Sequence, residues 1–205
     1  MANLYNVCLK YDFEALFKKK GYAYFTQGVY NLNIIGVRSD NNNKVTNKYD
    51  DYLVVTWNTP EGQTRRQVYP ITTEPGLYYI SKKLLNPKGT AILVPGQYRG
   101  CWQIGKHRGK YKALCQKKPV KVYRDNNLDE VYDLNSETIE SGIFGINIHR
   151  SDELKIYNLV NKWSAGCQVF QYASHFTAFM KKCEKQAELY GNSFTYTLVE
   201  EKDLV

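Results

Sequence analysis

A histidine and a cysteine stand eighteen positions apart in the chain, at His149 and Cys167. A thiol is a strong nucleophile only as the thiolate, and an imidazole within hydrogen-bond reach can take its proton. Gly166, just before the cysteine, allows a substrate to approach the backbone closely. The N–H groups of Ala165, Gly166 and Cys167 can then hold the oxyanion formed by attack on a carbonyl. We therefore predict a nucleophile, a base and an oxyanion hole in one short stretch. A depressed pKa of Cys167 would favour an enzyme over a non-catalytic protein.

The segments around this pair are mostly short apolar or alternating runs, which are typical of β-strands. A strand at 144–149 is predicted to carry His149 at its end, and residues 165–170 begin the next segment. Other strands are predicted at 30–37, 52–57, 65–72, 91–94, 120–123 and 194–199 (an edge strand), with a hairpin of 100–104 and 110–115 around a basic loop at 105–109. Helices are predicted at 12–20 and, amphipathic and capped by Ser174, at 175–190. The sequence thus predicts a mainly β fold with a few helices.

The stretch from about 142 to 170 resembles the catalytic domain of the L,D-transpeptidases. That family carries a histidine, a loop and then Ser-x-Gly-Cys-aliphatic-Arg, and here His149 is followed by Ser164-Ala165-Gly166-Cys167-Gln168-Val169. Three positions depart from the pattern. Arg150 stands where glycine or serine is usual, Ala165 where histidine or arginine is common, and Gln168-Val169 replaces the aliphatic-arginine pair. The residues of the chemistry therefore match better than the residues of substrate recognition.

The resemblance implies a β-sandwich catalytic domain with the cysteine and histidine at one end. We assign it residues 29–205, and treat residues 1–28 as an N-terminal helical appendage. The implied activity is cysteine-dependent acyl transfer on peptidoglycan stem peptides, in which His149 deprotonates Cys167 and water or an amine resolves the thioester. We expect hydrolysis, as in an endolysin-like murein peptidase, and keep the cross-linking reaction of an L,D-transpeptidase as the alternative.

Three neighbouring residues have proposed supporting roles. Ser164 either orients the nucleophile loop or is a simple turn residue. Arg150 either substitutes for the missing arginine and grips a substrate carboxylate, or is a surface cation beside Asp152. Trp163 either lines a substrate groove or packs in the core. The group that orients His149 is left open, because the resemblance implies a backbone carbonyl while acidic side chains lie nearby in the sequence. Those acidic alternatives are Asp125, Asp129 and Asp152.

The composition sets limits on partners and cofactors. The net charge of +8 suits polyanions such as the bacterial wall. We expect no nucleic-acid partner because no recognition module is present, and no membrane insertion because no run approaches ~20 apolar residues. Five widely spaced cysteines and three histidines argue against a disulfide framework and a zinc site, so we predict no cofactor or metal.

Residues 1–10 lack the basic start and apolar stretch of a signal peptide, so we expect synthesis in the cytoplasm. The motif region is similar to bacteriophage wall-lytic proteins, which would reach the wall through a lysis pore or in a virion. The departures at Arg150, Ala165 and Val169 also favour an alternative, a non-catalytic structural or wall-binding virion protein that kept the fold.

Overall fold

The computed structural model describes residues 3–204, and strands predominate there. The helices are α1 (Leu4–Lys10), α2 (Phe13–Lys20), α3 (Leu77–Ser81) and α4 (Ala173–Tyr190), with short 3-10 helices at Ser136–Thr138 and Glu201–Leu204. The strands are β1 (Asn33–Arg38), β2 (Asp51–Asn58), β3 (Thr64–Thr72), β4 (Thr90–Leu93), β5 (Gly96–His107), β6 (Tyr111–Gln116), β7 (Val120–Asp125), β8 (Glu140–Gly142), β9 (Ile148–Arg150), β10 (Gln168–Phe170) and β11 (Phe194–Glu200). The expectation of a mainly β fold with a few helices is confirmed.

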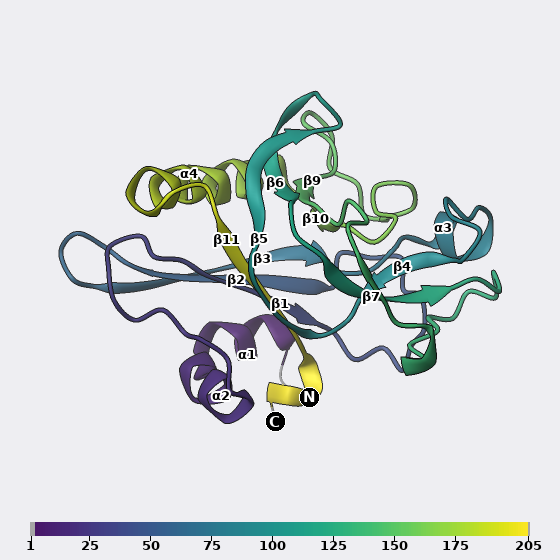
Figure 1. The fold of residues 1–205 in the computed structure, drawn as a ribbon, viewed down its shortest axis with the longest axis horizontal. Coiled ribbons are helices and arrows are strands. Elements are labelled where there is room, and N and C mark those ends of the chain that lie inside the picture. Colours follow the sequence, from purple (N-terminus) through teal and green to yellow (C-terminus); the bar gives the residue numbers. More distant parts are fainter. Residues whose placement is uncertain (1–2, 205) are drawn as a thin grey trace.

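Eight strands close into a barrel in the order β1-β11-β5-β6-β9-β10-β3-β2, and β4, β7 and β8 form a separate three-stranded sheet. Figure 1 shows α4 on one side of the long strands and α1 and α2 on the other. Most neighbouring strands are antiparallel, but β1–β11 and β9–β10 are parallel. The parallel pair β9–β10 aligns Val169 with His149, and so brings the cysteine loop beside the histidine strand.

Most predicted strands lie where the sequence places them, with different ends. The predicted hairpin turns later than expected, because β5 continues to His107 and β6 starts at Tyr111. His149 lies in the middle of the short strand β9 and not at a strand end. The edge-strand prediction for 194–199 is wrong, because β11 pairs with both β1 and β5. The helix α4 begins without a side-chain cap, so the prediction of a Ser174 cap is also wrong.

The helix α4 closes one side of the main hydrophobic cluster. Phe176, Phe179, Met180 and Cys183 form its buried face and join the barrel core. This spacing places all four on one stripe of the helix, as predicted from the sequence. Trp102 is fully buried in the same cluster, and its indole N–H donates to the carbonyl of Ile146 over 2.7 Å. That bond helps to fix the segment that leads into β9.

The helices α1 and α2 pack on the opposite face of the barrel. Asp12 caps α2 by accepting from the N–H of Ala15, and Gly21 ends it in the left-handed conformation, so the predicted helix is confirmed. The helices share a second hydrophobic cluster with barrel residues such as Ile35 and Val54. Residues 1 and 2 of the predicted 1–28 appendage, and residue 205 of the predicted catalytic domain, lie outside the described part of the chain.

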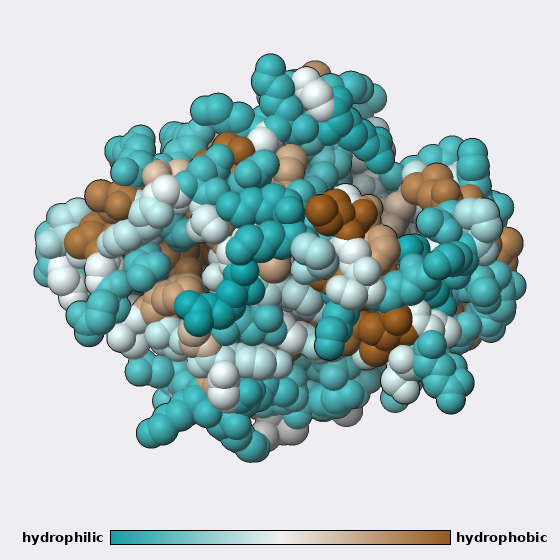
Figure 2. Space-filling view, in the orientation of Figure 1, coloured by the Kyte–Doolittle hydropathy of each residue, from teal (hydrophilic) through white to brown (hydrophobic). Residues whose placement is uncertain are grey.

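Figure 2 shows a face made mainly of hydrophilic residues, with a few separate hydrophobic patches. Between residues 3 and 204, no helix combines the length and the apolar character needed to cross a membrane.

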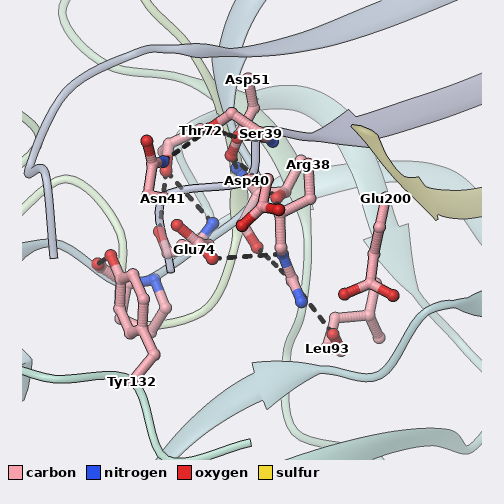
Figure 3. A network of polar contacts seen from close by, with 12 residues as sticks. Arg38, Ser39, Asp40, Asn41, Asp51, Thr72, Glu74, Leu93, Tyr132 and Glu200 are labelled. Carbon is pink, nitrogen blue, oxygen red and sulfur yellow. Dashed lines mark hydrogen bonds and ion pairs between the residues drawn. The ribbon is translucent and has the colours of Figure 1, made fainter. Parts of the chain in front are cut away.

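A buried polar network joins the barrel to the small sheet (Figure 3). The Arg38 guanidinium donates to the carbonyls of Thr73 and Leu93 and lies 3.3 Å from Glu74. Asp51 accepts four hydrogen bonds, from the N–H and hydroxyl groups of Ser39 and Thr73. Burial raises the pKa of Asp51, but its four donors and the charge of Arg38 oppose that rise, so Asp51 is the better held of the two carboxylates. Glu74 is therefore the group that keeps a proton: burial, followed by the charge of Asp51, raises its pKa to about 8.

Glu74 is expected to make stability fall as the pH rises from 4.5 to 8. The folded state keeps a proton that the unfolded state, with its ordinary pKa of 4.5, has already released. The stability contributed by Glu74 is fully present below pH 4.5. It is lost as the pH rises to the folded-state pKa of about 8, at up to about 1.4 kcal/mol per pH unit. Glu74→Gln removes this titration, so its free energy of unfolding should fall less across the window than that of the wild type. Urea unfolding at pH 5 and pH 8 measures the difference.

The exposed variant Glu137→Gln is the matched control, because its carboxyl group lies at the surface. It should follow the wild-type pH dependence. Parallel curves for the wild type and Glu74→Gln would contradict a buried, protonated Glu74.

Candidate active site

The nucleophile loop is held by the hydroxyl of Ser164. This fully buried side chain donates to the carbonyl of Cys167 over 2.8 Å and accepts from the N–H of Gly166 over 3.1 Å. The backbone carbonyl of Ser164 accepts from the N–H of Gly76 over 2.9 Å, which ties the loop to the segment before α3. These three hydrogen bonds place Ser164 where it can orient the nucleophile loop.

Gly166 has a φ of 119°, a conformation that L side chains rarely adopt. A Cβ at this position would lie 2.2 Å from the carbonyl oxygen of Ala91 in β4. The loop can therefore pass this close to β4 only with glycine. Of the three predicted oxyanion donors, the N–H of Gly166 is already used by Ser164. Within residues 3–204, no acceptor binds the N–H groups of Ala165 or Cys167, which leaves those two available.

The sulfur of Cys167 contacts backbone and not a side-chain base. Its thiol donates to the carbonyl of Gly145 over 3.3 Å, and the sulfur accepts from the N–H of Asn147 over 3.5 Å. Burial raises the pKa of Cys167 to about 11, while Asn147 and the charge of Arg108 act in the opposite direction. Loss of hydration outweighs the local donors, so the resting structure lacks the depressed thiol pKa that would favour the enzyme.

His149 is buried in β9 and its ring is oriented by the backbone. Its Nδ1 lies 2.8 Å from the carbonyl oxygen of Arg150, which also accepts from the hydroxyl of Tyr111 over 3.1 Å. A carbonyl only accepts, so Nδ1 carries the proton and Nε2 keeps the free lone pair of a base. The orienting group is thus a backbone carbonyl, as the resemblance implied, and not one of the three aspartates.

Burial, followed by the charge of His107, lowers the pKa of His149 to about 3. Because the thiol of Cys167 is also protonated near neutral pH, the resting pair consists of two neutral groups. His149 lies in β9 and Cys167 in the loop just before the adjacent strand β10, and between residues 3 and 204 no hydrogen bond joins the imidazole to the sulfur. The thiol is held by the carbonyl of Gly145, and His149 is not one of the residues that line the cavity beside Cys167.

The thiol opens into a cavity of about 470 Å³ between the small sheet and the loop before β9. Cys167 and Ala165 lie on one side of it, and His107 and Arg108 of the β5–β6 hairpin lie on another. None of the described lining residues is acidic. Leu85 and Ile143 also line it and are more than half exposed, so they give the cavity an apolar rim. A lining with basic and apolar residues suits a ligand that has an apolar part and a negative charge.

His107 is the site residue that the sequence analysis missed. Its ring stacks on His149 with centroids 4.0 Å apart and an interplanar angle of 19°. Its Nδ1 lies 3.1 Å from the side-chain amide nitrogen of Asn147, and the backbone N–H of the same asparagine donates to the sulfur of Cys167. The available signals were that His107 is one of three histidines and lies in the predicted basic loop. Neither signal brings it to His149, because the contact depends on the pairing of β6 with β9.

Two predicted substrate-binding residues do not line this cavity. The guanidinium of Arg150 contacts Glu153 over 2.8 Å and lies 4.3 Å from the ring centroid of Tyr111. It is thus already occupied. Trp163 lines a different hollow of about 410 Å³, together with Tyr78 and Tyr157. The arginines that line the cavity are Arg108 and Arg124. Arg108, at the tip of the hairpin, is better placed than Arg150 to meet a substrate.

Gln168, which stands where the resembled family has an aliphatic residue, is fully buried. Its amide oxygen accepts from the hydroxyl of Tyr196 over 2.7 Å, and its amide nitrogen donates to the carbonyl of Gly166 over 3.3 Å. The same amide nitrogen donates to the carbonyl of Thr73 over 3.5 Å, and this carbonyl also accepts from the guanidinium of Arg38. Gln168 therefore connects the nucleophile loop to the buried network of Figure 3.

No cluster of three or more histidine, cysteine or acidic side chains suited to a metal ion occurs within the described residues. Comparisons with protein-family models, curated proteins and solved structures found no match.

Alkylation of Cys167 is expected to be slow at neutral pH and to quicken steadily in alkali. Only the thiolate reacts, and with a pKa of about 11 its population rises about tenfold per pH unit between pH 7 and 10. Iodoacetamide labelling followed by mass analysis of the Cys167 peptide gives the rate at each pH. The four other cysteines yield separate peptides and act as internal references. A rate at Cys167 that levels off below pH 8 would contradict the raised pKa.

Proposed function

We propose that the protein is a cysteine-dependent acyl-transfer enzyme of the L,D-transpeptidase type that hydrolyses peptidoglycan stem peptides. The main support is one observation: Cys167 lines a cavity and its loop has two backbone N–H groups without an acceptor in residues 3–204, while His149, on the strand that pairs with β10, keeps an unprotonated Nε2. An L,D-transpeptidase-like fold is part of this proposal. It rests on the His149 to Cys167 spacing and the Ser-x-Gly-Cys sequence.

The proposed reaction starts from the neutral pair. Cys167 turns toward His149, whose Nε2 takes the thiol proton as the sulfur attacks the amide carbonyl carbon. The carbonyl π electrons move to the oxygen, and the N–H groups of Ala165 and Cys167 stabilise that charge. The protonated His149 then gives its proton to the leaving amine as the carbon–nitrogen bond breaks. The remaining thioester is hydrolysed by water, which regenerates the thiol.

The charges of the cavity fit this substrate class. Stem peptides carry carboxylates, and Arg108 supplies a cation at the cavity without any acidic lining residue. The second arginine of the cavity, Arg124, is partly neutralised by Glu140 at 3.0 Å. The overall charge of +8 would add long-range attraction to the anionic wall, weakening with salt. Arg108 thereby takes the role first proposed for Arg150.

Digestion of purified sacculi tests the proposal. Soluble peptide fragments, identified by mass analysis, would show hydrolysis and the bond that is cut. New cross-linked stem peptides would show transfer to an amine and favour the alternative of an L,D-transpeptidase. Sacculi of different stem-peptide chemistry should be included, because the substrate side chains are unknown. Unchanged sacculi in every case would reject the enzymatic proposal.

One observation favours a second candidate, a non-catalytic structural or wall-binding protein of a virion. The raised pKa of Cys167 and its backbone contacts are also what a structural thiol would show. A sedimentation assay separates the candidates, because such a protein would bind sacculi without altering them and would bind equally well after substitution of Cys167.

A further inference from the structure

The structure places a second imidazole at the proposed site. His107 lines the cavity with Cys167 and stacks on His149. It is mostly buried, and its Nδ1 is used by Asn147. Its Nε2 has no hydrogen-bond partner within residues 3–204, yet this atom is not among the fully buried polar atoms that lack a partner. The Nε2 edge is therefore accessible to solvent.

The hydrogen bonds fix opposite tautomers for the two rings. Asn147 accepts from the backbone N–H of Gln116 over 2.9 Å, so its oxygen faces Gln116 and its NH₂ faces His107. Nδ1 of His107 must then accept, which puts the ring proton on Nε2. His149 donates from Nδ1 to the Arg150 carbonyl and keeps Nε2 bare. One ring can accept a proton, and the other presents an N–H donor.

We propose that His107 is an oxyanion-binding residue whose Nε2–H donates a hydrogen bond to the substrate carbonyl oxygen as Cys167 attacks. This inference rests on the proposed function. It supplies a donor in place of the Gly166 N–H, which Ser164 already uses. A neutral imidazole has served as such an electrophile in other enzymes.

The role is that of a hydrogen-bond donor and not of a proton donor. His107 starts neutral, because burial, followed by the charge of Arg108, lowers its pKa to about 4. Full transfer of the Nε2 proton would leave an anionic imidazolate, so the proton stays on the ring. The leaving amine receives its proton from His149, which took it from the thiol, and the reaction balances. A neutral His107 also avoids placing a second cation against the protonated His149.

Two substitutions at one position test the role. His107→Phe keeps an aromatic ring for stacking on His149 but has no donor, and should lower kcat about 100-fold or more with little change in KM. His107→Gln places an amide N–H near the position of Nε2, and should recover activity to within about tenfold of the wild type. His175→Phe is the matched control, because this third histidine lies on α4 among Tyr69 and Tyr172, outside the cavity. Its kcat should stay at the wild-type value.

Turnover of sacculi by the wild type, measured in the same series, separates two kinds of failure. An active wild type with an equally active His107→Phe variant overturns the role of His107 and leaves the proposed function intact. An inactive wild type overturns both. A kcat for His107→Gln as low as that of His107→Phe would also overturn the donor role. A donor role predicts that the amide of glutamine restores activity, whereas a role in packing alone does not. Imidazole ¹⁵N shifts that show the same tautomer for both rings would reject the premise.

Discussion

Replacing Cys167 with alanine is expected to reduce turnover of sacculi to background, a loss of at least about 10⁴-fold. The sulfur is the only atom of the protein that bonds to the substrate carbon in the proposed mechanism. The fold should tolerate the change, because the lost contacts are two weak bonds to Gly145 and Asn147 and packing against a small cluster that contains Val169. Release of soluble peptides is the activity measurement, and thermal unfolding checks that the variant is folded.

Cys115→Ala is the matched control for this substitution. Cys115 is another partly exposed free thiol, on the neighbouring strand β6, and it does not line the cavity. Its variant should keep most of the activity. Cys167→Ser should be almost as inactive as the alanine variant, because a hydroxyl holds its proton more tightly than a thiol and is the weaker nucleophile at the same base. Activity retained by a folded Cys167→Ala protein would exclude the proposed nucleophile.

Gly166→Ala is expected to damage both the fold and the activity. The added Cβ would lie 2.2 Å from the carbonyl oxygen of Ala91, and the backbone would be held at a φ of 119°. The clash and the unfavourable backbone conformation together should cost about 3 kcal/mol or more. Relief of the clash must move the loop or β4, so the sulfur and the free N–H groups lose their alignment. We expect at least a 100-fold loss of turnover, measured beside the free energy of unfolding.

Gly62→Ala separates the two causes. Gly62 also has a positive φ, 77°, but its added Cβ would meet nothing within 4 Å. This control should cost about 1 kcal/mol from the backbone conformation alone and leave turnover unchanged. Equal stability and equal activity of the two variants would mean that the loop does not press against β4 as described.

The two longest helices and most strands follow from local sequence, whereas α1 and α3 were not predicted. Asp12 and Gly21 bound α2 because a side-chain cap and a left-handed glycine act within a few residues. The stripe of α4 is similarly a matter of helical spacing. Strand ends and the place of β11 were less accessible, because they depend on which strands pair across the barrel.

The candidate nucleophile and base, Cys167 and His149, were selected from residue types and spacing alone, since these fix which chemistry is available. The tertiary structure decided their surroundings. Pairing of β9 with both β6 and β10 stacks His107 on His149 and sets the loop beside the histidine strand. Packing against Glu153 and Tyr111 occupies Arg150, while Arg108 is left at the cavity. Burial by residues from distant parts of the chain raises the pKa of the thiol, because desolvation depends on everything that surrounds the sulfur and not on its neighbours in sequence.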